Sequence, residues 1–196
     1  MNEIFHRKYK RVLEILPDVA ECVKGRLALV GGTALALFYL NHRVSVDLDF
    51  VALDGNDVKL KEELKGCITK KGYRTIRGAY KNQFVIQFED TSIKVEVLGS
   101  EYKIQRFEER VFGNSKIKVA SLEDLLRMKK EAYENRKEAR DLFDIFCMMK
   151  RKDSDFEKVK KLIAKFGAPK EIDEISQMAS NPHDFELFKK VLLDAP

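Results

Sequence analysis

Tryptophan is absent from this chain, and cysteine, proline and histidine are scarce: the 196 residues include three cysteines, four prolines and three histidines. The cysteines, Cys22, Cys67 and Cys147, lie far apart and form no C-x-x-C pair. This spacing favours reduced, partly buried thiols in a cytoplasmic protein over a disulfide framework. The histidines are equally scattered, so the sequence suggests no zinc site.

Long apolar runs are also missing. A membrane-spanning helix needs about 20 consecutive apolar residues, and no stretch approaches that length. The first ten residues carry His6, Arg7, Lys8 and Lys10, but no apolar core follows them, so we expect no secretory signal. These absences predict a cytoplasmic protein that does not enter the membrane.

Neither sign of charge dominates the chain. There are 37 lysines and arginines against 32 aspartates and glutamates, which gives a net charge of +5. This excess is compatible with a nucleotide or nucleic-acid partner but does not demand one. Acids and bases are mixed along the sequence, so most of them are expected on a solvated surface. The length suffices for one α/β core with a helical appendage.

Residues 27–50, LALVGGTALALFYLNHRVSVDLDF, are the stretch around which the rest of the chain is organised. The apolar run at 27–30 predicts a buried strand. Gly31 and Gly32 follow at once, and two glycines permit a sharp turn and a close approach of the backbone to a ligand. Residues 33–40 combine good helix formers with apolar side chains, which predicts a buried helix.

Residues 45–50 alternate polar and apolar side chains, so they predict a strand that carries Asp47 and Asp49 on one face. Two like charges this close raise each other's pKa, and a divalent cation removes that cost. Mg²⁺ takes one or two carboxylates together with substrate phosphates. The N–H groups at the start of the preceding helix suit a phosphate. The stretch therefore predicts a metal site beside a phosphate site.

Each half of this motif also has an ordinary explanation. A Gly-Gly before a helix is often only a turn, and Asp-x-Asp on an exposed strand often only faces solvent. Here the two occur together, with Arg43 and Ser45 between them. That combined spacing favours a functional site.

Apolar periodicity predicts the other elements of an α+β protein. The expected elements are helices over 2–24, broken at Pro17, and over about 60–72, strands at 73–77, 83–88, 93–98 and 116–119, and an irregular segment at 99–115. From Ser121 onward the pattern is helical. We therefore expect an α/β core over 1–118 and a helical domain over 119–196.

The strand predicted at 93–98 has three apolar residues on one side and Lys94 and Glu96 on the other. An acid on such a strand is costly without a partner. A cross-strand ion pair at a sheet edge is the ordinary explanation. The alternative makes Glu96 a third carboxylate beside Asp47 and Asp49, in a site where acids hold metal ions for phosphoryl transfer.

A second set of charged residues lies in the helical region. Lys129 and Arg136 are spaced so that both can point from one face of a helix, and Asp141 and Asp144, at i and i+3, share a face. By spacing alone, such a set is most often an ion-pair lattice on the protein surface.

Two of these regions resemble a known family. Residues 31–37, Gly-Gly-Thr-Ala-Leu-Ala-Leu, and 42–50, His-Arg-Val-Ser-Val-Asp-Leu-Asp-Phe, resemble the first motif of the AbiEii/AbiGii-type toxin nucleotidyltransferases, within the DNA polymerase β-like superfamily. The wider superfamily usually has Gly-Ser where this chain has Gly31-Gly32. The family's later motifs are similar to the series Asp124-Leu125, Met128-Lys129, Arg136, Asp141-Leu142 and Asp144. The resemblance covers about residues 27–149.

The resemblance implies a small mixed sheet packed with helices and followed by a helical bundle. It also implies Mg²⁺-dependent nucleotide transfer, with Mn²⁺ as an alternative ion. The implied metal ligands are Asp47, Asp49 and Glu96, and the implied nucleotide-binding residues are Gly31, Gly32, Thr33, Arg43, Ser45, Lys129 and Arg136. The implied catalytic set adds Lys129, Asp141 and Asp144 to the metal ligands, with Asp141 positioning or deprotonating the acceptor and Asp144 supporting it.

We therefore predict a nucleotidyltransferase that moves a nucleoside monophosphate from an NTP to an acceptor, which is RNA such as tRNA, or a protein. By resemblance it is the toxin of a toxin–antitoxin pair, with an antitoxin as its partner. An inactive binding module with the same fold is one alternative, although the retained Asp47, Asp49, Lys129 and Asp141 argue against it. A small-molecule nucleotidyltransferase of the aminoglycoside-modifying kind is the other.

Overall fold

A computed structural model describes residues 3–151 and 156–195 of the chain. Its strands are β1 (Leu27–Val30), β2 (Leu48–Ala52), β3 (Arg74–Arg77), β4 (Gln83–Gln87), β5 (Ser92–Leu98), β6 (Phe107–Phe112) and β7 (Ser115–Ala120). Its α-helices are α1 (Glu3–Val23), α2 (Gly31–Leu35), α3 (Asp57–Lys70), α4 (Leu122–Arg136), α5 (Ala139–Arg151), α6 (Glu157–Phe166), α7 (Ile172–Met178) and α8 (Pro182–Leu193). A π-helical turn, η1 (Ala36–Leu40), continues α2, and a 3₁₀ turn, η2 (Ser100–Tyr102), follows β5.

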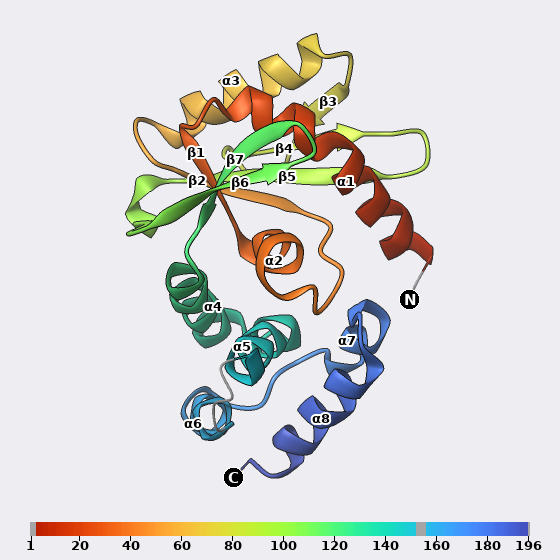
Figure 1. Cartoon of the computed structure of the whole chain (residues 1–196), viewed down its shortest axis with the longest axis vertical. Coiled ribbons are helices and arrows are strands. Elements are labelled where there is room, and N and C mark those ends of the chain that lie inside the picture. Colours follow the sequence, from red (N-terminus) through yellow and green to blue (C-terminus); the bar gives the residue numbers. More distant parts are fainter. Residues whose placement is uncertain (1–2, 152–155, 196) are drawn as a thin grey trace.

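The strands form one mixed sheet in the order β3-β4-β5-β2-β1-β7-β6. Helices α1 and α3 cover one face of this sheet and α2 lies against the other (Figure 1). Helices α4 to α8 gather beyond α2 and form the helical half of the molecule (Figure 1). The predicted α+β class and the helical C-terminal region are confirmed. No helix among the described residues combines the length and apolar character needed to cross a membrane.

The central strands place the acidic residues of the sheet side by side. All four residues of β1 are buried, and β2 runs antiparallel to β1 and parallel to β5. In that register Asp49 lies opposite Glu96. The strand predicted from residue 45 begins at Leu48. Ahead of it, Val44 donates its N–H to the carbonyl of Met178 in α7, at 2.8 Å. Asp47 therefore lies directly before β2.

Helix α1 runs unbroken through Pro17, so the predicted break into two helices is wrong. A proline inside a helix removes one hydrogen bond and costs about 3 kcal/mol. Val12, Ile15, Leu16 and Val19 on either side of it are fully buried. Each such side chain contributes about 1.5–3 kcal/mol on burial, so the continuous apolar face outweighs the lost hydrogen bond.

The segment predicted to be irregular, 99–115, contains the edge strand β6, which pairs antiparallel with β7. Most of its residues are exposed, including Phe107 and Val111. Even on its inner face Arg110 and Phe112 are only half-buried, and an edge strand of this kind needs no strict alternation of apolar and polar side chains. That is why the hydrophobic pattern did not reveal it.

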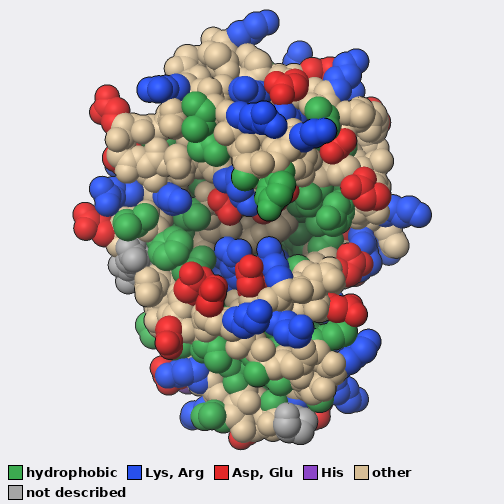
Figure 2. Space-filling model, turned by 180° about the vertical axis from the view of Figure 1, so that it is seen from behind, with side chains coloured by type: hydrophobic (Ala, Val, Ile, Leu, Met, Phe, Trp, Pro, Cys, Tyr) green, Lys and Arg blue, Asp and Glu red, His purple; other side chains and the backbone are tan. Residues whose placement is uncertain are grey.

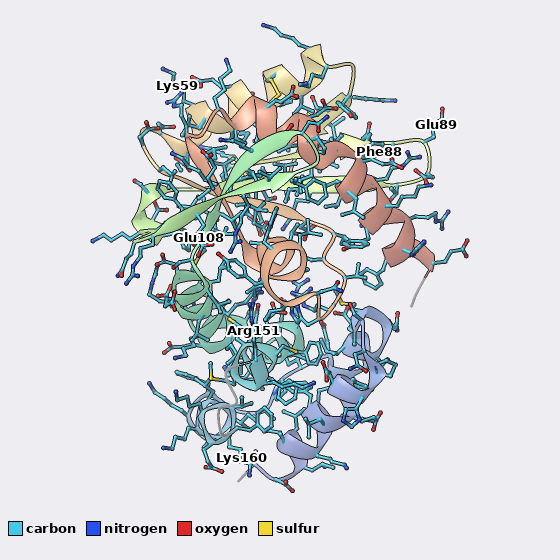
Figure 3. The ribbon with its side chains drawn as sticks, viewed as in Figure 1. Lys59, Phe88, Glu89, Glu108, Arg151 and Lys160 are labelled. Atoms are coloured by element: carbon cyan, nitrogen blue, oxygen red, sulfur yellow. A yellow bond between two sulfur atoms is a disulfide. The ribbon has the colours of Figure 1, made fainter. Side chains whose placement is uncertain are left out.

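Helix α5 is the core of the helical half. Ten of its residues are buried, and the ring of Phe143 packs edge-on against Phe188 with centroids 5.3 Å apart. At its end Arg151, labelled in Figure 3, donates a hydrogen bond of 2.5 Å to the carbonyl of Tyr39 in η1. This contact joins the helical half to the segment that leads into β2.

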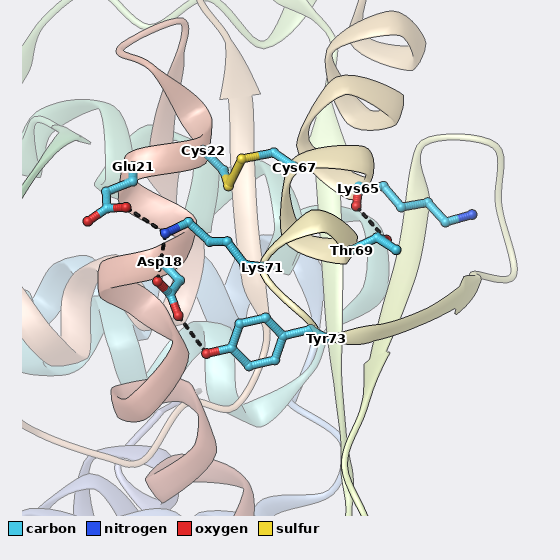
Figure 4. The surroundings of a disulfide bond; sticks show 8 residues. All are labelled: Asp18, Glu21, Cys22, Lys65, Cys67, Thr69, Lys71 and Tyr73. Atoms are coloured by element: carbon cyan, nitrogen blue, oxygen red, sulfur yellow. Dashed lines mark hydrogen bonds and ion pairs between the residues drawn. A yellow bond between two sulfur atoms is a disulfide. The ribbon is translucent and has the colours of Figure 1, made fainter.

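Cys22 and Cys67 form a disulfide between α1 and α3 (Figure 4), which corrects the prediction of reduced thiols. Cys147 is a free, buried thiol. The two bonded cysteines are 45 residues apart in sequence, and they meet because both helices cover the same face of the sheet. Near the bond, Lys71 pairs with Asp18 at 2.9 Å (Figure 4).

We predict that reduction of this disulfide destabilises the fold. A bond that closes a 45-residue loop contributes about 2–4 kcal/mol, because it restricts the unfolded chain. Urea unfolding with dithiothreitol should show that loss of unfolding free energy. A Cys22→Ser, Cys67→Ser variant should show the lower value and ignore the reductant. Thiol counting on the unfolded, unreduced protein should find Cys147 alone, and finding all three thiols would contradict the bond.

Candidate active site

A cleft of about 620 Å³ lies between the sheet and the helical half. One wall comes from the start of α2, from β2 and from β5, and the other from α4, α5 and α7. Figure 2 shows a hollow on one face of the molecule with acidic and basic side chains gathered at its edges. Sites for small molecules span about 300–1,000 Å³, so this cleft has the size for a nucleotide.

Three carboxylates line the sheet side of the cleft: Asp47, Asp49 and Glu96. Asp49 and Glu96 are neighbours across β2 and β5, and Asp47 precedes Asp49 by two residues. Burial raises the pKa of Asp49 to about 6, with the negative charges of Asp47 and Glu96 adding to the rise and Lys94 opposing it. One oxygen of Asp49, Oδ1, is buried and has no hydrogen-bond partner among the described residues.

The ammonium group of Lys94 lies among these carboxylates. Its Nζ atom is 3.5 Å from Oδ2 of Asp47, 3.9 Å from Oδ1 of Asp49 and 3.5 Å from Oε2 of Glu96. Lys94 is not among the site residues predicted from the sequence. The available signal was its position two residues before Glu96, on the same face of β5.

Gly31 and Gly32 line the cleft, and each leaves space for a neighbouring side chain. Gly31 has φ +72°, and a Cβ there would lie 2.7 Å from Oδ2 of Asp49. A Cβ on Gly32 would lie 2.5 Å from Nη2 of Arg43 and 2.7 Å from Oγ of Ser45. Any larger residue at either position would displace the groups that form the cleft wall.

Thr33 is absent from the cleft lining, and its contact with nucleotide stays a prediction. Its side chain is buried and donates to the carbonyl of Asp47, while its Oγ1 lies within hydrogen-bond distance, 3.0 Å, of the Oγ of Ser45. Ser45 lines the cleft. Thr33 therefore braces the segment that carries Ser45 and Asp47.

Asp144 is completely buried at the centre of an ion cluster. Arg43 binds it through Nε at 2.6 Å and Nη2 at 2.8 Å, Lys129 lies 2.7 Å from it, and Nε2 of His42 lies 2.6 Å from Oδ1. Burial disfavours the ionised carboxylate, but the charges of Arg43 and Lys129 hold the pKa of Asp144 well below its usual value. Asp144 is therefore a permanent anion that fixes its neighbours.

Asp141 is also completely buried. Oδ1 accepts from Lys129 at 2.8 Å, and Arg136 binds the carboxylate at 2.6 and 2.9 Å. Burial opposes ionisation, but Lys129 and Arg136 lower the pKa of Asp141 below its usual value. The ion pairs of Asp141 and Asp144 thus lie inside the protein, so the alternative of an ion-pair lattice on the surface is wrong. Asp141 also lies outside the cleft lining, and its role toward an acceptor stays a prediction.

Lys129 and Arg136 form the basic wall of the cleft. The side chain of Lys129 is 9% exposed and that of Arg136 is 45% exposed. The two buried aspartates thus act on the cleft by holding these cations in place. Lys8 and Arg140 extend the basic lining, and no motif in the sequence marked either of them.

The carboxylates of the cleft can be compared with the ligands that a divalent ion prefers. Among the described residues, no three His, Cys, Asp or Glu side chains are arranged to hold a metal as they stand. The donor set nevertheless fits a hard cation, because Asp47, Asp49 and Glu96 offer oxygen atoms. The unpartnered Oδ1 of Asp49 is a buried acceptor that such an ion would satisfy.

Comparison with known proteins identifies one matching family. Residues 15–193 match the family described as nucleotidyl transferase AbiEii toxin, type IV TA system. No curated protein sequence matches the chain.

Several solved structures share the fold. JHP933 from Helicobacter pylori is 22% identical with a TM-score of 0.53, over 90% of this chain and 79% of its own. MenT4, a nucleotidyltransferase toxin from Mycobacterium tuberculosis, is 20% identical with a TM-score of 0.54, over 79% of this chain and 63% of its own. The antibiotic-resistance factor ANT(2'')-Ia is 14% identical with a TM-score of 0.53, over 80% and 91%. At these identities the likeness concerns the fold.

We predict that Asp144→Asn destabilises the protein by about 3–5 kcal/mol, because removing one partner of a buried ion pair leaves the other charge buried and uncompensated. Arg43 is the cation left without its partner. Glu131→Gln is the control, since Glu131 forms an exposed ion pair with Arg127. This substitution should lower the free energy of unfolding by less than about 0.5 kcal/mol. Urea unfolding measures both, and equal losses would contradict the central position of Asp144.

We also predict that Asp49→Asn stabilises the metal-free protein at neutral pH. The pKa of Asp49 is raised to about 6 in the folded state, against about 3.9 when unfolded. The wild type should therefore lose stability relative to the variant as the pH rises from about 4 to about 6. Its side chain is 26% exposed, so after solvent screening the gap at pH 7.5 should be about 1 kcal/mol.

Melting curves in EDTA between about pH 4 and pH 8 check this gap, since they span both pKa values of Asp49. Asp57→Asn on α3, outside the cleft lining, is the control. A gap that does not change with pH, or a wild type more stable than the variant at pH 7.5, would show that the pKa of Asp49 is not raised.

Proposed function

The chain belongs to the AbiEii family of nucleotidyltransferase toxins, and on this premise we propose that it transfers a nucleoside monophosphate from an NTP to RNA. The observation that carries this proposal is the cleft itself. Three carboxylates line its sheet side and a row of cations lines its helical side. A metal–triphosphate complex needs both surfaces, since the ion takes carboxylates and the phosphates take cations.

Asp47, Asp49 and Glu96 are the residues that would hold the divalent ion, Mg²⁺ or Mn²⁺. A bound ion there would neutralise charge on the α-phosphate and favour the ionised form of an attacking hydroxyl. Gly31 keeps space for the Asp49 carboxylate, because any Cβ at residue 31 would lie 2.7 Å from Oδ2 of Asp49.

Lys129 and Arg136 would bind the phosphates from the other side of the cleft. Asp141 holds both cations, with its oxygens 2.8 Å from Lys129 and 2.6 Å from Arg136. This arrangement restricts their side chains before a nucleotide arrives, which lowers the entropic cost of binding. Asp141 and Asp144 are accordingly positioning residues. Ser45, with its hydroxyl held by Thr33, adds a neutral polar group to the nucleotide side.

In the proposed reaction the oxygen of an acceptor hydroxyl forms a bond to the α-phosphorus. The bond from that phosphorus to the oxygen bridging to the β-phosphate breaks, and pyrophosphate leaves. The hydroxyl proton passes to a carboxylate of the cleft. We assign this role to Glu96 in place of Asp141, since Glu96 lines the cleft and is 20% exposed, whereas Asp141 is fully buried.

The charge at the cleft lining favours an anionic acceptor. Lys8 on α1 and Arg140 on α5 add to the cations of the basic wall. RNA, including tRNA, matches these groups through its phosphates. A cationic aminoglycoside would need acids away from the metal site, and Glu131 and Glu174 are the other acids of the lining. The balance there favours RNA. Family membership also implies an antitoxin as the partner protein.

We predict that the protein labels RNA when it is incubated with each α-³²P-labelled NTP, Mg²⁺ and total RNA. Asp47→Asn combined with Asp49→Asn should abolish labelling, because both carboxylates of the metal site are lost. Asp54→Asn combined with Asp57→Asn is a matched control outside the cleft lining and should label normally. Gel autoradiography of RNA and of protein fractions identifies the acceptor.

Each outcome of this experiment separates the hypotheses. Label on protein would replace RNA as the acceptor. Full activity in the Asp47, Asp49 variant would mean that the metal site is wrong. Nucleotide binding without transfer to any fraction would favour the inactive binding module.

A further inference from the structure

Lys94 has an unusual position for a cation in a metal-binding cleft. Its Nζ atom lies 3.5 to 3.9 Å from one oxygen of each of Asp47, Asp49 and Glu96. It lines the same cleft as these acids. Neither the proposed metal ligands nor the proposed nucleotide-binding residues include it.

The fold, and not a chance side-chain rotamer, places Lys94 there. Residues 94 and 96 share one face of β5, because side chains alternate along a strand. The parallel pairing of β5 with β2 puts Leu48 beside Val95 and Asp49 beside Glu96. Lys94 is therefore level with the start of β2, where Asp47 and Asp49 are found.

The contacts of Lys94 are loose. Charge-assisted hydrogen bonds between nitrogen and oxygen are typically about 2.7–2.9 Å long, and Lys129 meets Asp144 within that range, at 2.7 Å. The three distances around Lys94 are all longer. The ammonium is thus held by the summed attraction of three acids instead of by one tight bond. Its side chain is 37% exposed, so a flexible lysine can swing into solvent.

We propose that Lys94 is an internal counter-cation of the acidic site that a divalent metal ion displaces, so that Lys94 sets the metal concentration at which the site fills. The inference rests on the proposed function, which assigns the metal to the same three carboxylates. An ion bound to these oxygens at about 2.0–2.1 Å would repel an ammonium that lies among them. Lysine and metal are therefore alternatives, and the lysine neutralises part of the acid charge while the metal is absent.

The test measures metal binding without nucleotide, by calorimetric titration of Mn²⁺ and Mg²⁺ into the protein. Lys94→Met and Lys94→Gln remove the competing charge, so the dissociation constant of the metal should fall by about tenfold. A tenfold change corresponds to roughly 1.4 kcal/mol of binding free energy. Lys94→Arg keeps the charge and should bind metal about as weakly as the wild type. Lys130→Met, on the exposed side of α4, should not change the constant.

A second readout is the melting temperature. In EDTA, Lys94→Met should melt below the wild type, because the three carboxylates lose their shared cation. Saturating Mn²⁺ should close that gap. Two results would overturn the inference: the charge-removing variants bind metal as tightly as the wild type, or they bind it more weakly. A lysine that the metal must displace weakens metal binding in the wild type, so its removal has to strengthen that binding.

Failure of the metal site itself looks different. In that case neither the wild type nor Lys94→Met would show binding that disappears when Asp47→Asn and Asp49→Asn are introduced. That result would overturn the proposed metal site and the inference together. Binding seen in Lys94→Met alone, and lost with the two aspartates, would support both.

Discussion

Asp144 is the residue on which the geometry of the cleft depends. Its carboxylate binds Arg43 and His42, which precede β2, and Lys129, which belongs to α4. The carboxylate, the guanidinium of Arg43 and the ammonium of Lys129 each cost several kcal/mol to remove from water, so the cluster is stable only when these ions meet. Because those members come from the sheet half and from the helical half, the requirement that they meet fixes the two walls of the cleft relative to each other.

The two walls then carry opposite charge. Acids lie on β2 and β5, and the cations of α4 face them from the helical half, held there by buried aspartates. Lys94 is a cation that lies among these acids. Like charges within one wall repel one another. In each wall a neighbouring group of opposite charge offsets this repulsion, and a ligand can replace that group or bind beside it. This arrangement matches a substrate that is itself a cation bound to a polyanion, as a metal–triphosphate complex is.

Prediction from sequence succeeded where the signal is local. The apolar run of β1, the helix α3 and the alternation in β5 follow from spacing within one element, and the structure contains all three. It failed where another part of the chain decided the outcome. Burial against the sheet keeps α1 continuous through Pro17, and pairing with β7 makes a strand of the exposed residues of β6. The disulfide likewise depends on two helices that share one face of the sheet.

The candidate site divides in the same way. The sequence by itself determined the glycine turn and the nearness of Asp47 to Asp49, because the freedom of glycine and a separation of two residues are properties of a short segment. The tertiary structure alone decided that Glu96 lies beside Asp49, that Lys94 lies among the acids, and that the aspartates of α5 are buried. Strand register and burial are set by contacts between residues far apart in the chain, and no spacing within one segment encodes them.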